Sequence, residues 1–178
     1  AGMAVLVPGT VAEAVDHDTI NFNLPPPATI FLTSGHLVVD KSVTITGPGQ
    51  DLLTVDGQGL SSVFYVVPPD PEWSLDKTVT ISGLTIANAS TDYQGGGVFQ
   101  WRGALTLRDC TLRNNYAREG GGGVFSHNGT LLITGCTLMN NTTYVSMDDY
   151  YGGGAVAFRA VGIKGAFTLT TLTIENSL

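Results

Sequence analysis

The chain has 178 residues, of which 43% are hydrophobic and 13% are charged, and its formal net charge is −7 at pH 7. This composition excludes a disordered chain and allows a buried core. The excess of acidic residues argues against nucleic acid or an anionic membrane as a partner. Because no apolar run is long enough to span a bilayer, we also expect no insertion into a membrane.

Residues 1–25 are expected to form a short N-terminal cap. Residues 11–15 have a helical pattern, residues 19–22 form a strand-like run, and the prolines at 25–27 close the segment. A stacked array needs such a cap, because its terminal coil otherwise exposes an unpaired strand edge.

Five short strands are predicted between this cap and residue 67. Each is a short apolar or alternating run, and glycine-containing turns separate them. They cover residues 29–33, 37–39, 43–46, 52–55 and 63–67.

From residue 79 onward, a unit of 26 residues repeats. The segment VTISGLTIAN begins at Val79, recurs as LTLRDCTLRN from Leu105 and as LLITGCTLMN from Leu131, and a fourth copy is predicted from Phe167. Glycine triplets lie between the copies, at residues 95–97, 121–123 and 152–154. This period and three short strands per unit predict an all-β protein, a right-handed parallel β-helix of about six coils. We expect it to span residues 26–178 and to be truncated at its C-terminal end.

Two columns of equivalent positions are predicted to stabilise the stack from within. One is a ladder of buried amides that bond to one another and to the turns. It comprises Asn88, Asn114, Asn140 and Asn176. In the other, Cys110 and Cys136 replace the leucines of the other copies, Leu84 and Leu172, so we expect stacked, buried thiols without a disulfide.

Two further columns have more than one interpretation. Threonines 85, 111, 137 and 173 are expected to face solvent; a flat threonine array suggests ice binding, but the preference of threonine for strands already explains it. The second column contains Phe99, Trp101, Phe125 and His127, which share one parity of the strands after the glycine triplets. Facing outward, these rings would offer a platform for a sugar or a protein. Burial of large side chains is the commoner outcome, so we expect them in the core.

The third unit carries two insertions that point to a candidate binding surface, because insertions in repeat proteins fall in surface loops. Aromatic and acidic side chains of these and other loops are the candidates for contact with a ligand. They are Tyr144, Asp148, Asp149, Tyr150, Tyr151, Trp73 and Trp101. Adjacent aspartates rarely converge on one ion, so we expect no cofactor, with Ca²⁺ at Asp148 and Asp149 as the alternative.

Some of these motifs resemble those of a known group of proteins. Gly153-Gly154-Ala155-Val156 and the Leu-x-x-Asn segments ending at Asn115 and Asn141 resemble the repeats of the polymorphic outer membrane protein type, marked by G-G-A-[ILV] and F-x-x-N. The stretch from Asp18 to Gly49 is similar to the N-terminal part of surface proteins of the CSLREA-domain class. The resemblance implies a bacterial β-helix module that is secreted or at the cell surface. Its role would be structural or adhesin-like, with a carbohydrate or a surface protein as partner.

A polysaccharide lyase or hydrolase of the pectate-lyase-type fold is the alternative function. Hydrolysis needs converging carboxylates, and no acidic column forms, since Asp109 aligns with Gly83, Gly135 and Thr171. We therefore expect a module that binds without catalysis and has no catalytic residue. The lack of a C-terminal cap also suggests end-to-end association with a second copy.

Overall fold

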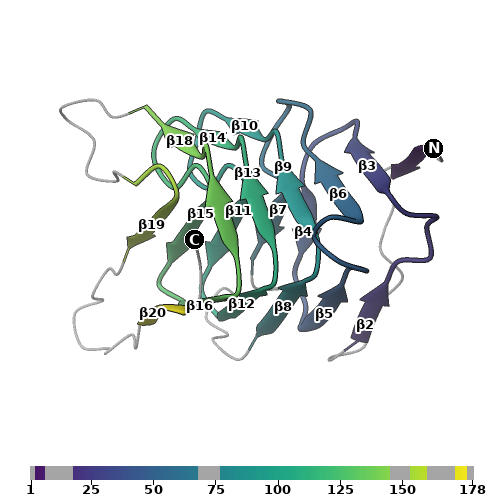
Figure 1. Cartoon of the computed structure of the whole chain (residues 1–178). Helices are drawn as coiled ribbons and strands as arrows, with labels where there is room; N and C mark the ends of the chain where they lie inside the picture. Colours follow the sequence, from purple (N-terminus) through teal and green to yellow (C-terminus); the bar gives the residue numbers. More distant parts are fainter. Residues whose placement is uncertain (1–2, 7–17, 68–76, 145–152, 160–170, 176–178) are drawn as a thin grey trace.

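The protein is a stack of parallel strands. The structure, a computed structural model, describes residues 3–6, 18–67, 77–144, 153–159 and 171–175. Within these ranges every regular element is a strand, and each strand pairs in parallel with the strands of the neighbouring coils. The predicted all-β parallel solenoid is confirmed (Figure 1). The helical pattern at residues 11–15 lies outside the described residues.

Three long sheets and one small sheet form the solenoid. Sheet A consists of β1 (Met3–Leu6), β3 (Ala28–Leu32), β6 (Leu53–Asp56), β9 (Thr85–Ala87), β13 (Thr111–Arg113) and β17 (Thr137–Met139). Sheet B consists of β2 (Asp18–Asn21), β5 (Val43–Thr46), β8 (Thr78–Ser82), β12 (Ala104–Arg108), β16 (Thr130–Thr134) and β20 (Thr171–Glu175). Sheet C consists of β4 (Leu37–Val39), β7 (Phe64–Val66), β11 (Val98–Trp101), β15 (Val124–His127) and β19 (Val156–Arg159). Sheet D consists of the two-residue strands β10 (Ser90–Thr91), β14 (Tyr116–Ala117) and β18 (Thr142–Thr143).

Each turn of the chain passes through sheets A, C and B in that order. Because β3, β6, β9, β13 and β17 are successive strands of sheet A, the described chain completes four turns between β3 and β17. The predicted coil number of about six is therefore slightly high. The strands β1 and β2, which fall in the predicted cap, continue sheets A and B. The five strands predicted before residue 67 are confirmed as β3 to β7.

The core fills the space between sheets A, B and C, with sheet A in front of sheet C and sheet B below both in Figure 1. Side chains alternate between the two faces of a strand, so every second residue of β3, β5 and β6 is buried. Ile86, Leu107 and Val124, one from each long sheet, are 0% exposed. Burial of each such side chain contributes about 1.5–3 kcal/mol to the free energy of unfolding.

The register of the last coil differs from the predicted one. In sheet B, Leu172 of β20 pairs with Leu131 of β16, so Leu172 and Thr173 do not align with Cys136 and Thr137. The predicted fourth copy is wrong in this respect, because an alternating segment fits either strand of the unit equally well and the pattern cannot choose between them. Asn176 lies outside the described residues.

The third glycine triplet is also displaced by one residue. Gly121 donates its N–H to the carbonyl oxygen of Gly153 at 2.9 Å, and Val124 pairs with Val156. The triplet that stacks on residues 121–123 is therefore 153–155, and the insertion before it is one residue longer than the sequence predicts.

The buried amide ladder is present, but one residue later than predicted. Asn115 is 0% exposed; its Nδ2 donates to the Oδ1 of Asn141 at 3.0 Å and to the carbonyl oxygen of Ile86 at 3.1 Å. Asn141 repeats this pattern by donating to the carbonyl oxygen of Leu112 at 2.8 Å.

The predicted asparagine column lies instead at the turn before this ladder. Asn88, Asn114 and Asn140 have φ values of 56°, 56° and 55°, a left-handed conformation that asparagine tolerates better than most residues. Asn114 and Asn140 are exposed. Their turn geometry, not amide stacking, explains why asparagine recurs there, so the prediction of a buried ladder at these positions is wrong.

Cys110 and Cys136 are confirmed as buried, stacked thiols without a disulfide. The backbone N–H of Cys110 lies 3.4 Å from the Sγ of Cys136. The hydrogen bond between the two thiols and the burial of the side chain raise the pKa of Cys110. A thiol held neutral in this way is a packing group, because the thiolate is the reactive form.

The threonine column of sheet A is not uniformly open to solvent. Thr85 is 4% exposed and its hydroxyl donates to the carbonyl oxygen of Gln50 at 2.7 Å. The hydroxyl of Thr111 lies 3.0 Å from the Oε1 of the same glutamine. The turn at residue 50 thus covers part of sheet A, and the predicted solvent-facing column is wrong at Thr85.

Candidate functional site

Most of the binding residues predicted from the insertions cannot be placed. Asp148, Asp149, Tyr150, Tyr151 and Trp73 lie outside the described residues. Tyr144, in the first insertion, is the last described residue before residue 153 and is 59% exposed. Trp101, at the end of β11, is half-buried and lines a groove on the outside of the solenoid. Of the predicted residues, Trp101 is therefore the one that the structure places in a candidate site.

The aromatic column of sheet C faces away from the main core. Val98 and Gln100 of β11 point inward and are 0% exposed, as are Val124 and Ser126 of β15. The intervening Phe99 packs in a separate cluster on the outer face. Phe99 and Phe125 are buried as expected, at 6% and 2% exposed, but they lie in this second cluster and not in the interior of the solenoid.

Hydrogen bonds explain why glutamine and serine can take the inward positions. The Nε2 of Gln100 donates to the carbonyl oxygens of Gly103 at 3.0 Å and Thr130 at 3.1 Å. Its Oε1 accepts from the hydroxyl of Ser126 at 2.7 Å. A buried polar group is costly only when it lacks a partner. This network therefore lets Gln100 face inward, and the alternation of the strand then turns Phe99 outward.

The outward rings stack on one another along the solenoid axis. We call His36, Tyr65, Phe99 and Phe125 the aromatic ladder. Successive ring centroids are 4.7, 4.7 and 5.8 Å apart, with interplanar angles of 29°, 10° and 6°. Each ring thus covers the face of its neighbour; His36 is exposed and Tyr65 is half-buried, whereas Phe99 and Phe125 are buried. Trp101 stacks in the same way on His127 at 4.0 Å.

A groove of about 720 Å³ runs beside the aromatic ladder. Its floor is formed by His36, Tyr65, Phe99 and Trp101. Its wall comes from two loops of successive coils, residues 59–62 after β6 and residues 90–94 around β10. The lining residues of these loops are Gly59, Leu60, Ser61, Ser62, Ser90, Thr91, Asp92, Tyr93 and Gln94.

Hydrogen bonds hold the wall of the groove in place. The N–H of Ser90 donates to the carbonyl oxygen of Ser61 at 3.3 Å, which joins the two loops. The N–H of Tyr93 donates to the hydroxyl of Thr91 at 3.2 Å, and the amide of Gln94 donates to the carboxylate of Glu119. The wall is therefore a fixed surface rich in hydroxyl and amide groups.

Two apolar side chains stand open at the rim of the groove. Tyr93 is 71% exposed and Leu60 is 58% exposed. Unlike the rings of the aromatic ladder, Tyr93 stacks on no other ring of the described residues, so no ring competes with a ligand for its faces. No pattern in the sequence marked Tyr93, since the groove forms only where its loop meets the loop of the preceding coil.

The groove carries little charge. Among the described lining residues, Asp92 is the one with a formal charge at pH 7, because burial beside the Tyr65 ring lowers the pKa of His36 below its ordinary value. No group of three or more His, Cys, Asp or Glu side chains in the described part of the chain is arranged to hold a metal ion. The proposal of bound Ca²⁺ at Asp148 and Asp149 stays a prediction.

A buried lysine lies at the corner between sheets C and B. Lys77 is 5% exposed, and its Nζ donates to the carbonyl oxygens of Val39, at 3.2 Å, and of Val67. It thereby caps the ends of β4 and β7. Burial lowers the pKa of Lys77 to about 8, and nearby Asp40 opposes this shift.

This shift predicts an unusual pH dependence of stability. Between about pH 8 and pH 10.5 the unfolded state binds more protons at Lys77 than the folded state does, so the free energy of unfolding rises with pH. We expect a gain on the order of 2 kcal/mol, less than the full shift gives, because the corner is close to solvent. Urea unfolding at pH 7.5 and pH 10 should show it in the natural chain. Lys77→Met should lack it; an equal gain in this variant would contradict the assignment.

A scan against protein-family models and searches of the curated proteins and of the solved structures found no match to this chain. The described residues contain no helix of the length and apolar character that crossing a membrane requires. The family resemblance of the repeats therefore stays a prediction, and the groove is the feature from which a function can be inferred.

Proposed function

We propose that this protein is a non-catalytic β-solenoid module of the cell exterior or cell surface that binds a carbohydrate chain in the groove beside the aromatic ladder. The observation that carries the proposal is the composition of the groove, an aromatic floor facing a wall of hydroxyl and amide groups. Ligand sites of this kind combine apolar surface with a few placed polar groups. Sugars suit it because they present C–H faces and hydroxyl groups together.

The two kinds of aromatic residue would contact a sugar differently. The faces of Tyr65 and Phe99 are covered by ring stacking; half-buried Tyr65 offers an apolar edge, whereas Phe99 is 6% exposed and mainly supports the floor from below. The exposed faces of Tyr93 can stack on a sugar ring. Ser61, Ser90 and Thr91 then lie within the same groove to exchange hydrogen bonds with hydroxyl groups.

Binding without turnover is the expected activity. Glycoside hydrolysis uses two carboxyl groups on either side of the scissile bond, and Asp92 is the single carboxylate among the described residues that line the groove. The external location and the adhesin-like role are supported by the resemblance of the repeats to surface proteins, and end-to-end association remains a prediction.

Tyr93→Ala is expected to weaken glycan binding about tenfold, since the loss of one stacked sugar face is worth about 1.4 kcal/mol. A glycan array would first select the ligands, and isothermal titration would then compare the affinities of the natural chain and the variant. The same samples would be assayed for released oligosaccharides.

The control is Tyr144→Ala, a tyrosine of similar exposure that does not line the groove. It should leave the affinity unchanged. A loss of binding in Tyr144→Ala but not in Tyr93→Ala would move the site to the insertion predicted from the sequence. Release of sugar products would show that the protein is an enzyme.

A further inference from the structure

The groove spans several coils of the solenoid. His36 precedes β4, Tyr65 lies in β7, and Phe99 and Trp101 lie in β11, three neighbouring strands of sheet C. Neighbouring strands lie about 4.8 Å apart, so the floor extends about 10 Å along the axis. A ligand that contacts the whole floor must therefore be an extended chain of at least two or three sugar rings that lies along the axis, across the strands.

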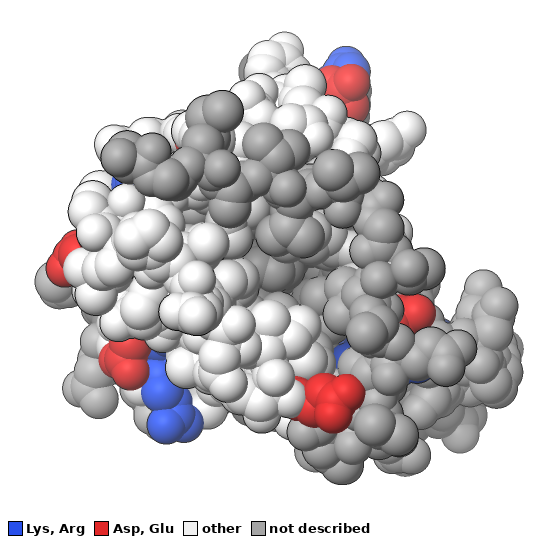
Figure 2. Space-filling model, turned by 90° about the vertical axis from the view of Figure 1, so that its right-hand side faces the viewer, with Lys and Arg blue, Asp and Glu red and all other residues white. Residues whose placement is uncertain are grey.

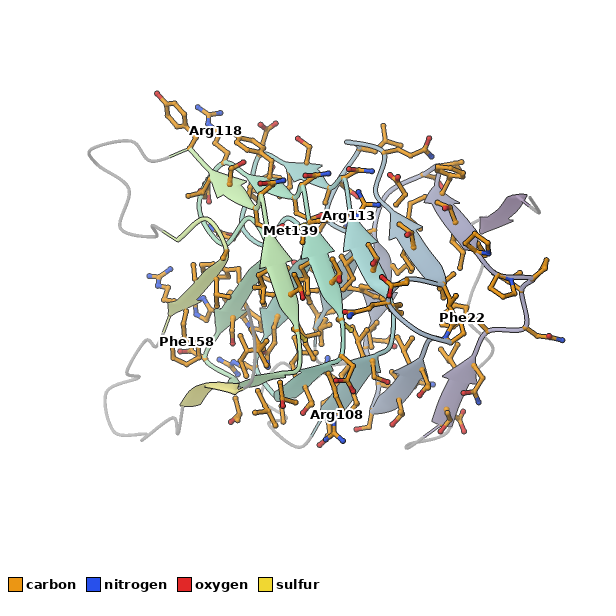
Figure 3. All side chains as sticks on the ribbon, in the orientation of Figure 1. Phe22, Arg108, Arg113, Arg118, Met139 and Phe158 are labelled. Atoms are coloured by element: carbon orange, nitrogen blue, oxygen red, sulfur yellow. The ribbon has the colours of Figure 1, made fainter. Side chains whose placement is uncertain are left out.

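The charges around the groove restrict that chain further. The described lining residues include no lysine or arginine. In the coil after Asp92, the N–H of Arg118 donates to the carbonyl oxygen of Thr91 at 2.9 Å. Its side chain, however, is exposed and points away from the solenoid (Figure 3). The carboxylate of Asp92 therefore has no cationic lining residue to balance it.

The charge balance of the whole chain also disfavours an acidic ligand. The chain has 8 Lys and Arg against 15 Asp and Glu. Figure 2, which looks onto the end of the stack that carries β1 and β2, shows the charged side chains of the described residues there as a few separate groups. A carboxylated sugar placed beside Asp92 would meet like charge, which is costly when the charges are brought together at an interface.

From these observations we infer that the groove is selective for an uncharged oligosaccharide, laid along the solenoid axis from His36 to Trp101, and rejects uronic-acid chains. The inference rests on the proposed function and names the substrate class of the same site. It also separates this protein from the alternative of an enzyme for acidic pectic polymers, because such a substrate would enter the groove against an unbalanced carboxylate.

The test compares two probes that differ in the charge of their carboxyl groups and by one methyl group per ring. Oligogalacturonate and its methyl ester have the same backbone, and cello- and chito-oligosaccharides of two to six rings serve as further uncharged probes. In isothermal titration with the whole chain, the ester or another uncharged probe should bind at least tenfold more tightly than the acid. Affinity should rise with length up to three rings and then level off.

A variant tests the role of Asp92. Asp92→Asn should lower the ratio of uncharged to acidic affinity several-fold, because the like charge is removed without a change in shape. A higher affinity for the acid in the natural chain, or an unchanged ratio in Asp92→Asn, would overturn the inference and leave carbohydrate binding standing. Failure of every probe and of a full glycan array to bind would overturn both.

Discussion

Gly122→Ala is expected to destabilise the protein by about 4 kcal/mol or more and to lower the yield of folded chain. A Cβ atom on Gly122 would lie 2.2 Å from the carbonyl oxygen of Thr142 and 2.6 Å from that of Gly154. Both obstacles are backbone atoms of the next coil, so no side chain can rotate away. Relief requires the coils to separate, and overpacking that cannot relax is among the few causes of such large losses.

The same clash recurs one coil earlier, which explains the glycine triplets. A Cβ on Gly96 would lie 2.4 Å from the carbonyl oxygen of Gly122. The close approach coincides with inter-coil hydrogen bonds, such as that from the N–H of Gly97 to the oxygen of Gly122 at 2.9 Å. The triplets are needed for this contact between coils and not for a special φ value at each position.

Gly59→Ala is the control for the effect of adding a methyl group. Nothing lies within 4 Å of its Cβ, but its φ is +69°, so the cost should be about 1 kcal/mol from the left-handed conformation alone. Urea unfolding followed by circular dichroism would compare the variants. If Gly122→Ala fails to fold, its soluble yield beside Gly59→Ala is the readout. A loss below about 1 kcal/mol in Gly122→Ala would contradict the close approach.

Asn115→Ala should lower the free energy of unfolding by about 3 kcal/mol. Its side chain donates to Ile86 and Asn141 and accepts from the N–H of Ala89 at 3.1 Å. Because the position is 0% exposed, water cannot replace these partners. Each buried group left unpaired costs about 1–3 kcal/mol, and the lost packing adds to this. Chemical denaturation would measure the change.

The neighbouring asparagine provides the matched control. Asn114→Gly removes an exposed amide whose contact with Asn88 is long, 3.5 Å, and keeps a residue suited to a φ of 56°. We expect a change of less than about 0.5 kcal/mol. Equal losses in the two variants would mean that the structure assigns the ladder to the wrong asparagine.

Two adjacent asparagines also show how far the sequence could predict the interior of the stack. The repeat indicates an asparagine at the end of each strand, but Asn114 and Asn115 both fit a ladder when only spacing is considered. The choice depends on the left-handed turn at Asn114, which rotates the next side chain inward. The resemblance of Leu-x-x-Asn to a repeat motif was the signal that marked Asn115.

Strand positions were predictable because alternation and turn residues are local signals. The strands β3 to β7 and the 26-residue register of β8, β12 and β16 follow the sequence closely. Which side chains of β11 face the solenoid interior was not predictable in this way, since it depends on whether Gln100 finds hydrogen-bond partners in a neighbouring coil. The predicted register of the last coil was wrong for a related reason, because the pattern around Leu172 fits two strands of the unit equally well.

The groove could not be predicted from the sequence because its residues come from several repeat units. Its floor comes from three coils, and its wall combines the loop at Ser61 with the loop at Ser90. Each segment alone reads as an ordinary turn. The insertions drew attention to Tyr144, whereas the open ring beside a described groove is Tyr93.

The register of sheet B gives the molecule a property of its own. The strand β12 pairs with β8 and with β16 at the same offset, Leu105 with Val79 on one side and with Leu131 on the other. A unit that pairs with its own copy in this way can be gained or lost as a whole. Duplication or deletion of one 26-residue segment in the gene would leave each remaining junction of the same kind, so the length of the protein can evolve in whole steps without redesign of its interior.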